Sequence, residues 1–326
     1  MTLKSLLGLS LTLILLNALT YYADLPGWVY ILTSLAFINL CLLAWYHDAK
    51  EAVEEENETF PKDLINNELD MAKRVQEGLL SVESPQVEGI KIAKRCIPAS
   101  NVGGDFYTII GKNTEKLTQK AKTPGVIEYV NASNFHLGVA IGDVAGHGVS
   151  SALVMALSAG IMDKIAHNHE SPAEVLQRSN NDIEKFISNS QISHLTALYA
   201  VINTDQKTLT VAKAGHHPIL RVSKDNSIDH LDAEGTFLGM FKDETYEDAD
   251  YTIAHKDRLF FYTDGIIETT NHKKEEYGLE RMQEIITQHA NEDIESLMDA
   301  IYDDVKAFRG NGPVKDDQTL VIIEID

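Results

Sequence analysis

The 326-residue chain contains only two cysteines, Cys41 and Cys96, and few positively charged residues. Two cysteines so far apart cannot form the disulfide framework of a small secreted domain, and the sequence has no cysteine and histidine cluster of the zinc type. Lysine and arginine total 28 against 49 aspartates and glutamates, a formal net charge of −21 at pH 7. Because such a chain repels phosphate backbones, we expect no nucleic-acid partner.

Charged residues are also missing from two long stretches near the N-terminus, residues 5–22 and 28–46. At about 1.5 Å per residue, a helix over the first stretch would be about 27 Å long, close to the hydrocarbon thickness of a bilayer. The second stretch has tryptophan and tyrosine at both ends, as spanning helices commonly do at the membrane surfaces. With a tight turn over residues 23–27, we predict a transmembrane helical hairpin over residues 1–47.

The orientation of this hairpin is predicted from its flanking charges. Lys4 and Lys50 lie outside the two spans, and the turn between the spans carries only Asp24. Because positive residues favour the cytoplasmic side, both termini are expected there. We therefore expect a multi-pass protein of the inner, or cytoplasmic, membrane with the chain after residue 47 in the cytoplasm. A cleaved signal peptide is the alternative for the first span, but a second full-length span follows it.

A charged helical linker is predicted over residues 48–84. Its second part, residues 62–80, places apolar side chains at three- and four-residue steps. These are Ile65, Leu69, Ala72, Val75 and Leu79. Such a stripe on an otherwise polar helix needs a partner. Two interpretations stay open: the stripe packs on the chain's own domain, or it forms the coiled-coil seam of a homodimer.

From residue 85 to the end of the chain, strand patterns predominate and helical patterns come in separate blocks. Residues 135–142 alternate bulky and small side chains, the period of a strand with one buried face. Helices are predicted over residues 147–167, 172–189, 278–289 and 292–308. Antiparallel-looking groups of strands with separate helices indicate an α+β domain over residues 85–326. The polar stretch 112–133 is predicted to be a surface loop or a hairpin.

Aspartates stand at the ends of several apolar strands. Asp143 and Asp264 each end an apolar run, Asp105 follows two glycines, and Asp316 and Asp317 open the last strand. Burying an unpaired carboxylate is costly, so a cluster of them must be paired or bind cations, and no arginine recurs beside these residues. Oxygen ligands alone suit Mg²⁺ or Mn²⁺. Taken singly, each aspartate is also typical of a helix cap or turn, but together they predict a divalent metal site.

Six motifs occur in the order seen in one enzyme family. They are PASNVGGDFY, GDVAGHG, AGHHP, the pair Leu238–Gly239, FYTDGIIE and DDQT. On these motifs, residues 85–326 resemble the PPM-type metal-dependent protein phosphatases, in their SpoIIE-like bacterial branch. The resemblance implies an α-β-β-α sandwich of two antiparallel sheets flanked by helices. The stretch ELDMAKRVQEGLL also resembles the helical linker that commonly precedes this domain.

The resemblance further implies a centre of two divalent ions, Mn²⁺ or Mg²⁺. By motif, Asp143 bridges both ions with help from the carbonyl oxygen of Val144. Asp264 and Asp316 complete the ligand set, and Asp105 holds a metal or its waters. A hydroxide that bridges the metals would attack phosphorus in line, without a phosphoenzyme, because the metals lower the pKa of bound water.

Three positions keep more than one interpretation. Asp317 is the second choice for the ligand at the DD position. His147 either protonates the leaving alkoxide or is a turn residue that contacts backbone. Thr108 stands where many relatives have a second aspartate, and its effect would be on a weakly held metal.

The function that the resemblance implies is that of a membrane-anchored protein serine/threonine phosphatase with a signalling partner. Relatives typically act on phosphorylated anti-sigma-factor antagonists with a STAS fold, or on similar switch proteins. Two alternatives stay open. One is a catalytically weak signalling or binding module, which Thr108 and the 112–133 insertion would suit. The other is a phosphatase of a small phosphorylated metabolite.

Overall fold

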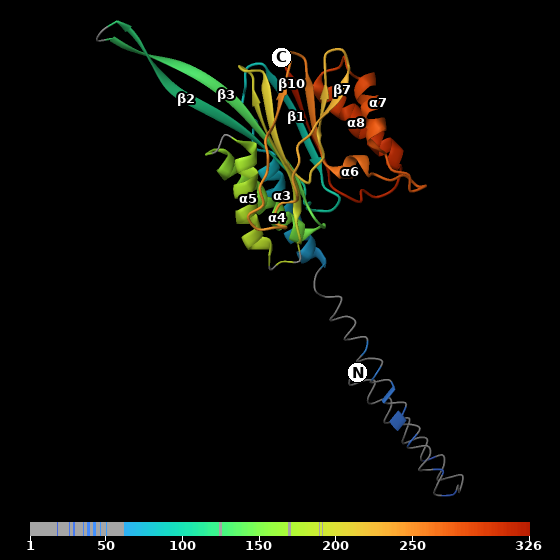
Figure 1. Cartoon of the computed structure of the whole chain (residues 1–326). Coiled ribbons are helices and arrows are strands. Elements are labelled where there is room, and N and C mark those ends of the chain that lie inside the picture. The colour runs from blue at the N-terminus through green and yellow to red at the C-terminus, as the bar shows by residue number, and fades with distance from the viewer. Residues whose placement is uncertain are drawn as a thin grey trace. The chain divides into compact units, whose positions relative to one another are not determined.

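The computed structural model describes residues 62–123, 126–168, 171–188, 190 and 192–326, with scattered positions between residues 18 and 50 (Figure 1). The predicted transmembrane hairpin over residues 1–47 therefore lies almost entirely outside the described residues. The chain divides into two compact units, residues 1–68 and 69–326. All strands among the described residues lie in the second unit.

Two five-stranded sheets form the second unit, and every strand pair in them is antiparallel. Sheet A has the order β1 (Ile90–Ile97), β10 (Gln318–Ile325), β9 (Arg258–Tyr262), β6 (Ile219–Val222) and β7 (Ile228–Leu231). Sheet B has the order β2 (Phe106–Thr123), β3 (Val126–Val144), β4 (Leu195–Asn203), β5 (Thr208–Ala214) and β8 (Ala249–Thr252). The predicted pair of antiparallel sheets is confirmed.

Helices cover the outer faces of both sheets (Figure 1). The helices are α3 (Lys62–Leu80), α4 (Val149–Ala166), α5 (Pro172–Ile187), α6 (Asp264–Ile267), α7 (Leu279–Gln288) and α8 (Ile294–Arg309). Buried residues of α4 and α5 share one apolar cluster with sheet B, and those of α7 and α8 share another with sheet A. A third cluster joins the facing sides of the two sheets. The layers are therefore α-β-β-α.

Alternating side chains explain why the strands are buried on both faces. In β9, Leu259 and Phe261 join the cluster between the sheets, whereas Phe260 and Tyr262 join the cluster under α7 and α8. This follows from the two-residue period of a strand, which sends successive side chains to opposite faces. Each large apolar side chain buried in this way contributes about 1.5–3 kcal/mol. Strands of this kind hold the two sheets and the outer helices together.

The polar stretch 112–133 belongs to a long hairpin of β2 and β3. Their pairing runs from Phe106 opposite Gly142 to Thr123 opposite Val126. Of the two predicted structures, a loop or a hairpin, the hairpin is the one observed. Figure 1 shows it extending away from the rest of the sheets.

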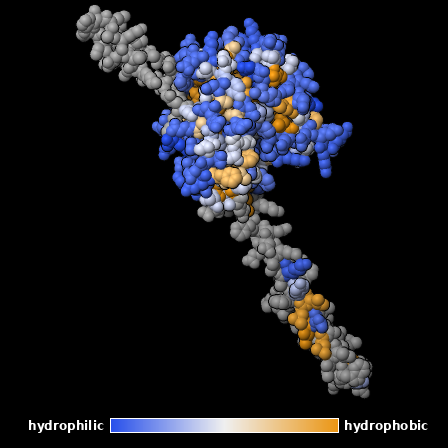
Figure 2. Space-filling model, viewed as in Figure 1, coloured by the Kyte–Doolittle hydropathy of each residue, from blue (hydrophilic) through white to orange (hydrophobic). Residues whose placement is uncertain are grey.

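Among the described residues, α4 is the one helix whose length and mean hydropathy would allow it to cross a membrane. Its Met155 and Met162 are fully buried and belong to the cluster shared with sheet B. Its apolar character therefore serves the core of the second unit. Figure 2 shows the surface of that unit as largely hydrophilic, with smaller apolar areas.

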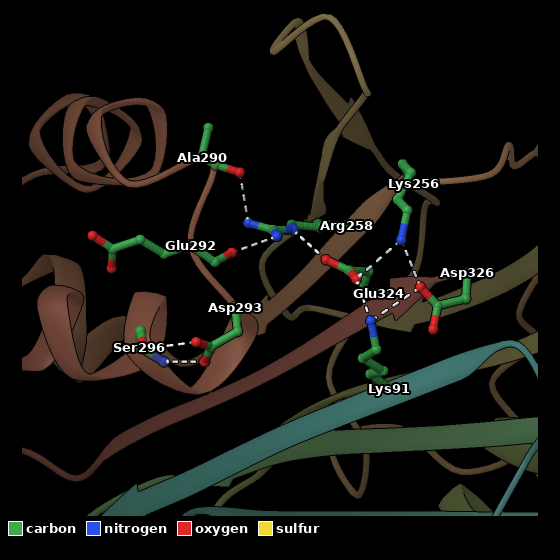
Figure 3. Close-up of polar contacts among 9 residues, drawn as sticks. All are labelled: Lys91, Lys256, Arg258, Ala290, Glu292, Asp293, Ser296, Glu324 and Asp326. Atoms are coloured by element: carbon green, nitrogen blue, oxygen red, sulfur yellow. Dashed lines mark hydrogen bonds and ion pairs between the residues drawn. The ribbon is translucent and has the colours of Figure 1, made fainter.

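A network of charged side chains lies at one end of sheet A (Figure 3). Glu324, 5% exposed, accepts hydrogen bonds from Lys91 Nζ at 3.0 Å and from Arg258 Nε at 2.7 Å. The guanidinium of Arg258 also donates to the carbonyl oxygens of Ala290 and Glu292. These contacts tie β1, β9 and β10 to the connection between α7 and α8.

Candidate metal centre

The strand register brings the predicted site residues to the other end of the sandwich. Asp105 immediately precedes β2, and Asp143 is the penultimate residue of β3, where Gly142 pairs with Phe106. Asp264 follows β9 by two residues, and Asp316 precedes β10, whose Leu320 pairs with Tyr262. One end of each sheet therefore contributes acidic side chains to the same region.

Asp105 is the most enclosed of these carboxylates, with 2% of its surface exposed. Its Oδ2 accepts hydrogen bonds from the hydroxyls of Thr263 and Thr319, both at 2.7 Å. Thr319 lies in β10 and Thr263 directly follows β9, so the contacts join sheet A to the residue before β2, beside the site. Burial, and then the negative charge of Asp143, raise the pKa of Asp105 well above its usual value.

Asp317 holds the loop that carries Asp105. Its Oδ1 accepts from the backbone N–H of Ala99 at 2.7 Å, and its Oδ2 accepts from those of Gly104 at 2.5 Å and Asp105 at 3.4 Å. A Cβ on Gly103 would lie 2.4 Å from this same Oδ2, so the loop can approach the carboxylate only because it has no side chain there. Both oxygens of Asp317 are thus engaged with backbone.

Asp143, Asp264 and Asp316 form the more open part of the site. Burial, followed by the charges of Asp264 and Asp316, raises the pKa of Asp143 to about 8. Burial also raises the pKa of Asp316, and Asp264 adds to that effect. Within the described residues, no lysine or arginine forms an ion pair with any of these three carboxylates. No lysine or arginine of the described residues therefore offsets the repulsion among the three side chains.

The backbone of Val144 lies against the loop that precedes β2. Its N–H donates to the carbonyl oxygen of Gly104 at 3.4 Å. A Cβ on Gly104 would lie 2.9 Å from the carbonyl oxygen of Val144 and 3.5 Å from Oδ1 of Asp143. The carbonyl that sequence analysis paired with Asp143 is thus on the same side of the loop as that carboxylate.

The residues fit an oxygen-binding divalent cation by their chemistry. In the described part of the chain, no three acidic, histidine or cysteine side chains are spaced to hold one ion as they stand. The gathered donors are nevertheless carboxylate and carbonyl oxygens, which Mg²⁺ and Mn²⁺ prefer. Burial, and then the charges of neighbouring carboxylates, raise the pKa values of Asp105, Asp143 and Asp316, and a bound cation would offset both effects.

Three histidines of the motifs lie in different surroundings. His147 is exposed in the turn before α4, and its charge lowers the pKa of Asp316. His216 is buried, with Nδ1 2.8 Å from Oγ1 of Thr196, and burial lowers its pKa to about 3. The ring of His217 stacks on Tyr262 with centroids 5.5 Å apart. Of the three, only His147 is solvent-exposed.

Sequence analysis missed the two threonines and one glutamine that support the site. Thr263 and Thr319 lie within the FYTDGIIE and DDQT motifs, so their position was signalled but their contact with Asp105 was not. Gln76, on α3, contacts the backbone of Gly103. Nothing in the pattern of the linker distinguishes this polar residue from its neighbours.

Comparison with known proteins agrees with this arrangement. The family described as Stage II sporulation protein E (SpoIIE) matches residues 133–326. Phosphoserine phosphatase RsbU of Bacillus subtilis (strain 168) is 29% identical over 262 residues, 79% of this chain and 70% of that protein. The family match covers the carboxylates of β3, α6 and the start of β10.

Solved structures share the fold at lower sequence identity. The SiaA-PP2C domain of Pseudomonas aeruginosa has a TM-score of 0.64 at 20% identity, and the match covers 82% of this chain and 99% of that one. The structure of RsbX in complex with magnesium has a TM-score of 0.51 at 14% identity, covering 75% of this chain and 99% of that one. The family match extends over more than half of the sequence, and the chain therefore belongs to the SpoIIE family of metal-dependent phosphatases and is a protein serine/threonine phosphatase.

Proposed function

We propose that the chain is a membrane-anchored phosphatase that uses two divalent ions, Mn²⁺ or Mg²⁺, to hydrolyse phosphoserine or phosphothreonine on a signalling protein. The observation that carries the proposal is the meeting of four acidic residues from separate elements at one end of the sandwich. They are Asp105, Asp143, Asp264 and Asp316. Uncompensated carboxylates at this density are costly unless cations bind them.

The residues of the site have separate roles in this proposal. Asp143, Asp264 and Asp316, with the carbonyl oxygen of Val144, hold the ions. Asp105 lies deeper and supports the bound ions from there, because Thr263 and Thr319 fix its carboxylate by hydrogen bonds. When bound, such ions supply an activated water and stabilise negative charge on the phosphoryl oxygens.

Two further residues act beside this ligand set. Backbone N–H groups donate to both oxygens of Asp317, which favours a role in positioning the loop over a role as a metal ligand. His147 is exposed close to Asp316, where it can give a proton to the departing serine or threonine oxygen.

Turnover by the purified full chain tests the activity. We expect release of phosphate from a phosphoserine protein when Mn²⁺ is supplied, and a loss of at least about 100-fold in Asp143→Asn. Asp303→Asn, at an exposed position of α8, is the matched control and should retain the full rate. Unchanged turnover after removal of metal with a chelator would refute the metal-dependent mechanism. Tight binding of the phosphoprotein without turnover would favour the signalling module, and a preference for small phosphate esters would favour the metabolite phosphatase.

The proposed substrate is a phosphorylated switch protein of the STAS type. RsbU, a phosphoserine phosphatase by name, supports a phosphoprotein substrate, and the partner itself rests on the resemblance. A phosphoproteome comparison between cells with the wild-type chain and cells with Asp143→Asn identifies the substrate. We expect a phosphoserine or phosphothreonine on a STAS domain to accumulate in the variant. Accumulation confined to proteins of other folds would reject this choice of partner.

Membrane anchoring is supported by exposed apolar side chains at described positions of the first unit. Leu35, Ile38, Leu42 and Leu43 are helical and 53–62% exposed. Apolar surface of this kind is costly in water and favourable in lipid. We expect the full chain to stay with membranes after alkaline washing, with residues 62–326 accessible to protease from the cytoplasmic side. Release of the full chain by the wash would contradict the anchor.

The apolar stripe of the linker supports a homodimer. Val75 is 66% exposed and Leu79 is 46% exposed, so this part of the stripe does not pack on the chain's own domain. Of the two interpretations open from the sequence, this exposure supports the seam with a second copy. We expect Val75→Asp to shift the full chain toward monomer in sedimentation, whereas Lys73→Asp, on another face of α3, should not. An unchanged oligomeric state in Val75→Asp would rule out this seam.

A further inference from the structure

Helix α3 has one buried side chain in its central turns, and that side chain is polar. Every residue from 65 to 79 is exposed or half-exposed except Gln76, which is 8% exposed. Burying an amide is unfavourable unless its donor and acceptor are both satisfied. The position of Gln76 therefore depends on what its amide contacts.

The amide of Gln76 contacts the backbone of a single residue at two points. Its Nε2 donates to the carbonyl oxygen of Gly103 at 2.7 Å, and its Oε1 accepts from the N–H of Gly103 at 2.9 Å. Two parallel hydrogen bonds fix the orientation of a group as well as its distance, whereas one bond leaves it free to turn. Gly103 is thus held in place by the linker helix.

Gly103 belongs to the loop that delivers Asp105 to the site. The next residue, Gly104, donates its N–H to Asp317 and accepts at its carbonyl from the N–H of Val144. The loop is therefore held from three sides: by the start of β10, by the end of β3 and by α3. The first two belong to the sandwich itself, and only α3 is part of the linker.

The end of α3 has attachments that do not involve Gln76. Tyr107 Oη donates to the carbonyl oxygen of Leu80 at 2.9 Å, and Lys94 Nζ donates to that of Val82 at 2.6 Å. Loss of the Gln76 amide would therefore leave the helix docked while freeing Gly103. The contact with Gly103 can be tested apart from the docking of the helix.

We propose that Gln76 is a positioning residue for the carboxylate site: its amide fixes Gly103, and through Gly103 the backbone of Asp105, so that the linker helix sets the affinity of the site for divalent metal. This inference rests on the proposed metal-dependent function. It makes the linker part of the site and not only a connection to it.

The test compares Gln76→Met with wild type, both as the full chain. Methionine keeps the length of the side chain but neither donates nor accepts as the amide does. We expect about a tenfold weaker binding of Mn²⁺, measured by electron paramagnetic resonance of free Mn²⁺ without substrate. We also expect faster hydrogen exchange in residues 99–106 and unchanged exchange in α7 and α8. At saturating Mn²⁺, kcat should return to near the wild-type value.

Arg74→Met, at an exposed position on the same helix, is the matched control and should leave both measurements unchanged. Gln76→Glu keeps an acceptor for the N–H of Gly103 and should restore part of the protection of the loop from exchange. If Gln76→Met does not fold, Gln76→Glu takes its place in the test. Wild-type Mn²⁺ affinity and wild-type exchange in the Gln76 variants would overturn the proposal. Absence of Mn²⁺-dependent turnover in the wild type would instead overturn the proposed function, because the exchange comparison does not depend on turnover.

Discussion

The hydroxyl of Thr319 donates to Oδ2 of Asp105 at 2.7 Å, and this bond joins β10 of sheet A to the residue that precedes β2 of sheet B. The hydroxyl of Thr263 meets the same oxygen at the same distance. These two hydroxyls stabilise the charged form of Asp105 against the cost of burial. Neutral hydroxyls, and not a positively charged side chain, therefore compensate the burial of this carboxylate.

Removing one of these hydroxyls should weaken metal binding. In Thr319→Val, Asp105 keeps only Thr263, its pKa rises further, and ionising it for a cation becomes more costly. We expect Mn²⁺ affinity to fall several-fold and the free energy of unfolding to fall by about 1 kcal/mol. Mn²⁺ titration and urea denaturation measure the two effects.

Thr263→Val gives the internal comparison. The Oγ1 of Thr263 also accepts from the N–H of Thr319 at 3.0 Å, so its loss leaves a second buried group unpaired. A larger loss of stability is expected than in Thr319→Val. Equal Mn²⁺ affinity in both variants and wild type would show that the hydroxyls do not support the site.

The metal-free protein should lose stability as pH rises toward 8. The pKa of Asp143 is raised to about 8 in the folded state, against an ordinary value of about 4 in the unfolded chain. The folded state therefore holds this proton more tightly, so its contribution is complete below about pH 4 and is lost as pH rises through about 8. Urea denaturation at several pH values, with a chelator present, measures this slope.

Asp143→Asn should flatten the same profile, because asparagine does not titrate. At pH 8 without metal, the variant is expected to be more stable than wild type, although it lacks activity. Adding Mn²⁺ should stabilise the wild type and have less effect on the variant. A wild-type profile that is already flat would mean that the carboxylate repulsion is relieved in some other way.

How much of the fold the sequence predicts depends on the length of each pattern. The strand over residues 135–142 was predicted because its alternation is long, and it forms the end of β3. The strands β7 and β8 were missed because each has four residues, lies at a sheet edge and mixes polar with apolar side chains. The outer part of the hairpin of β2 and β3 was left open because residues 112–133 are mostly polar and contain Pro124 and Gly125, so the sequence fits a loop as well as a pair of strands.

For the site, position was predictable and role was not. An aspartate at the end of an apolar strand signals a carboxylate at a sheet end, which is where Asp143 and Asp264 lie. The two members of the DD pair look alike in sequence, and only the packed structure shows that Asp317 meets three backbone N–H groups. Gln76 was missed for the same reason, because its burial depends on a loop 27 residues away.

The charge network at the far end of sheet A should affect stability without affecting activity. Burial alone would raise the pKa of Glu324, but hydrogen bonds from Lys91 and Arg258 outweigh it and hold the pKa below its usual value. Glu324→Gln removes the charge while leaving Arg258 in place, and we expect the free energy of unfolding to fall by about 1–3 kcal/mol. Glu324 pairs with Arg258, at the opposite end of β10 from the carboxylate site, so kcat and Mn²⁺ affinity should not change.

Asp326→Asn is the matched control for this network. Asp326 is more exposed than Glu324, and its partners Lys91 and Lys256 are exposed lysines. Surface pairs of this kind contribute about 0–1 kcal/mol, so the loss should be smaller. A fall in Mn²⁺ affinity in Glu324→Gln would contradict the separation of the two ends.

Substitutions of the neighbouring residues Asp316 and Asp317 should distinguish a metal ligand from a positioning residue most clearly. Asp316→Asn removes an exposed carboxylate, so we expect weaker Mn²⁺ binding and loss of turnover, with wild-type hydrogen exchange in residues 99–105. In Asp317→Asn, the amide N–H₂ would face backbone N–H groups that now donate to a carboxylate, so the loop must release at least one of them. Hydrogen exchange in residues 99–105 should then become faster, and the affinity for Mn²⁺ should fall. If the two variants were indistinguishable by exchange, Asp317 would not be holding the loop, and the ligand role would be open to both aspartates.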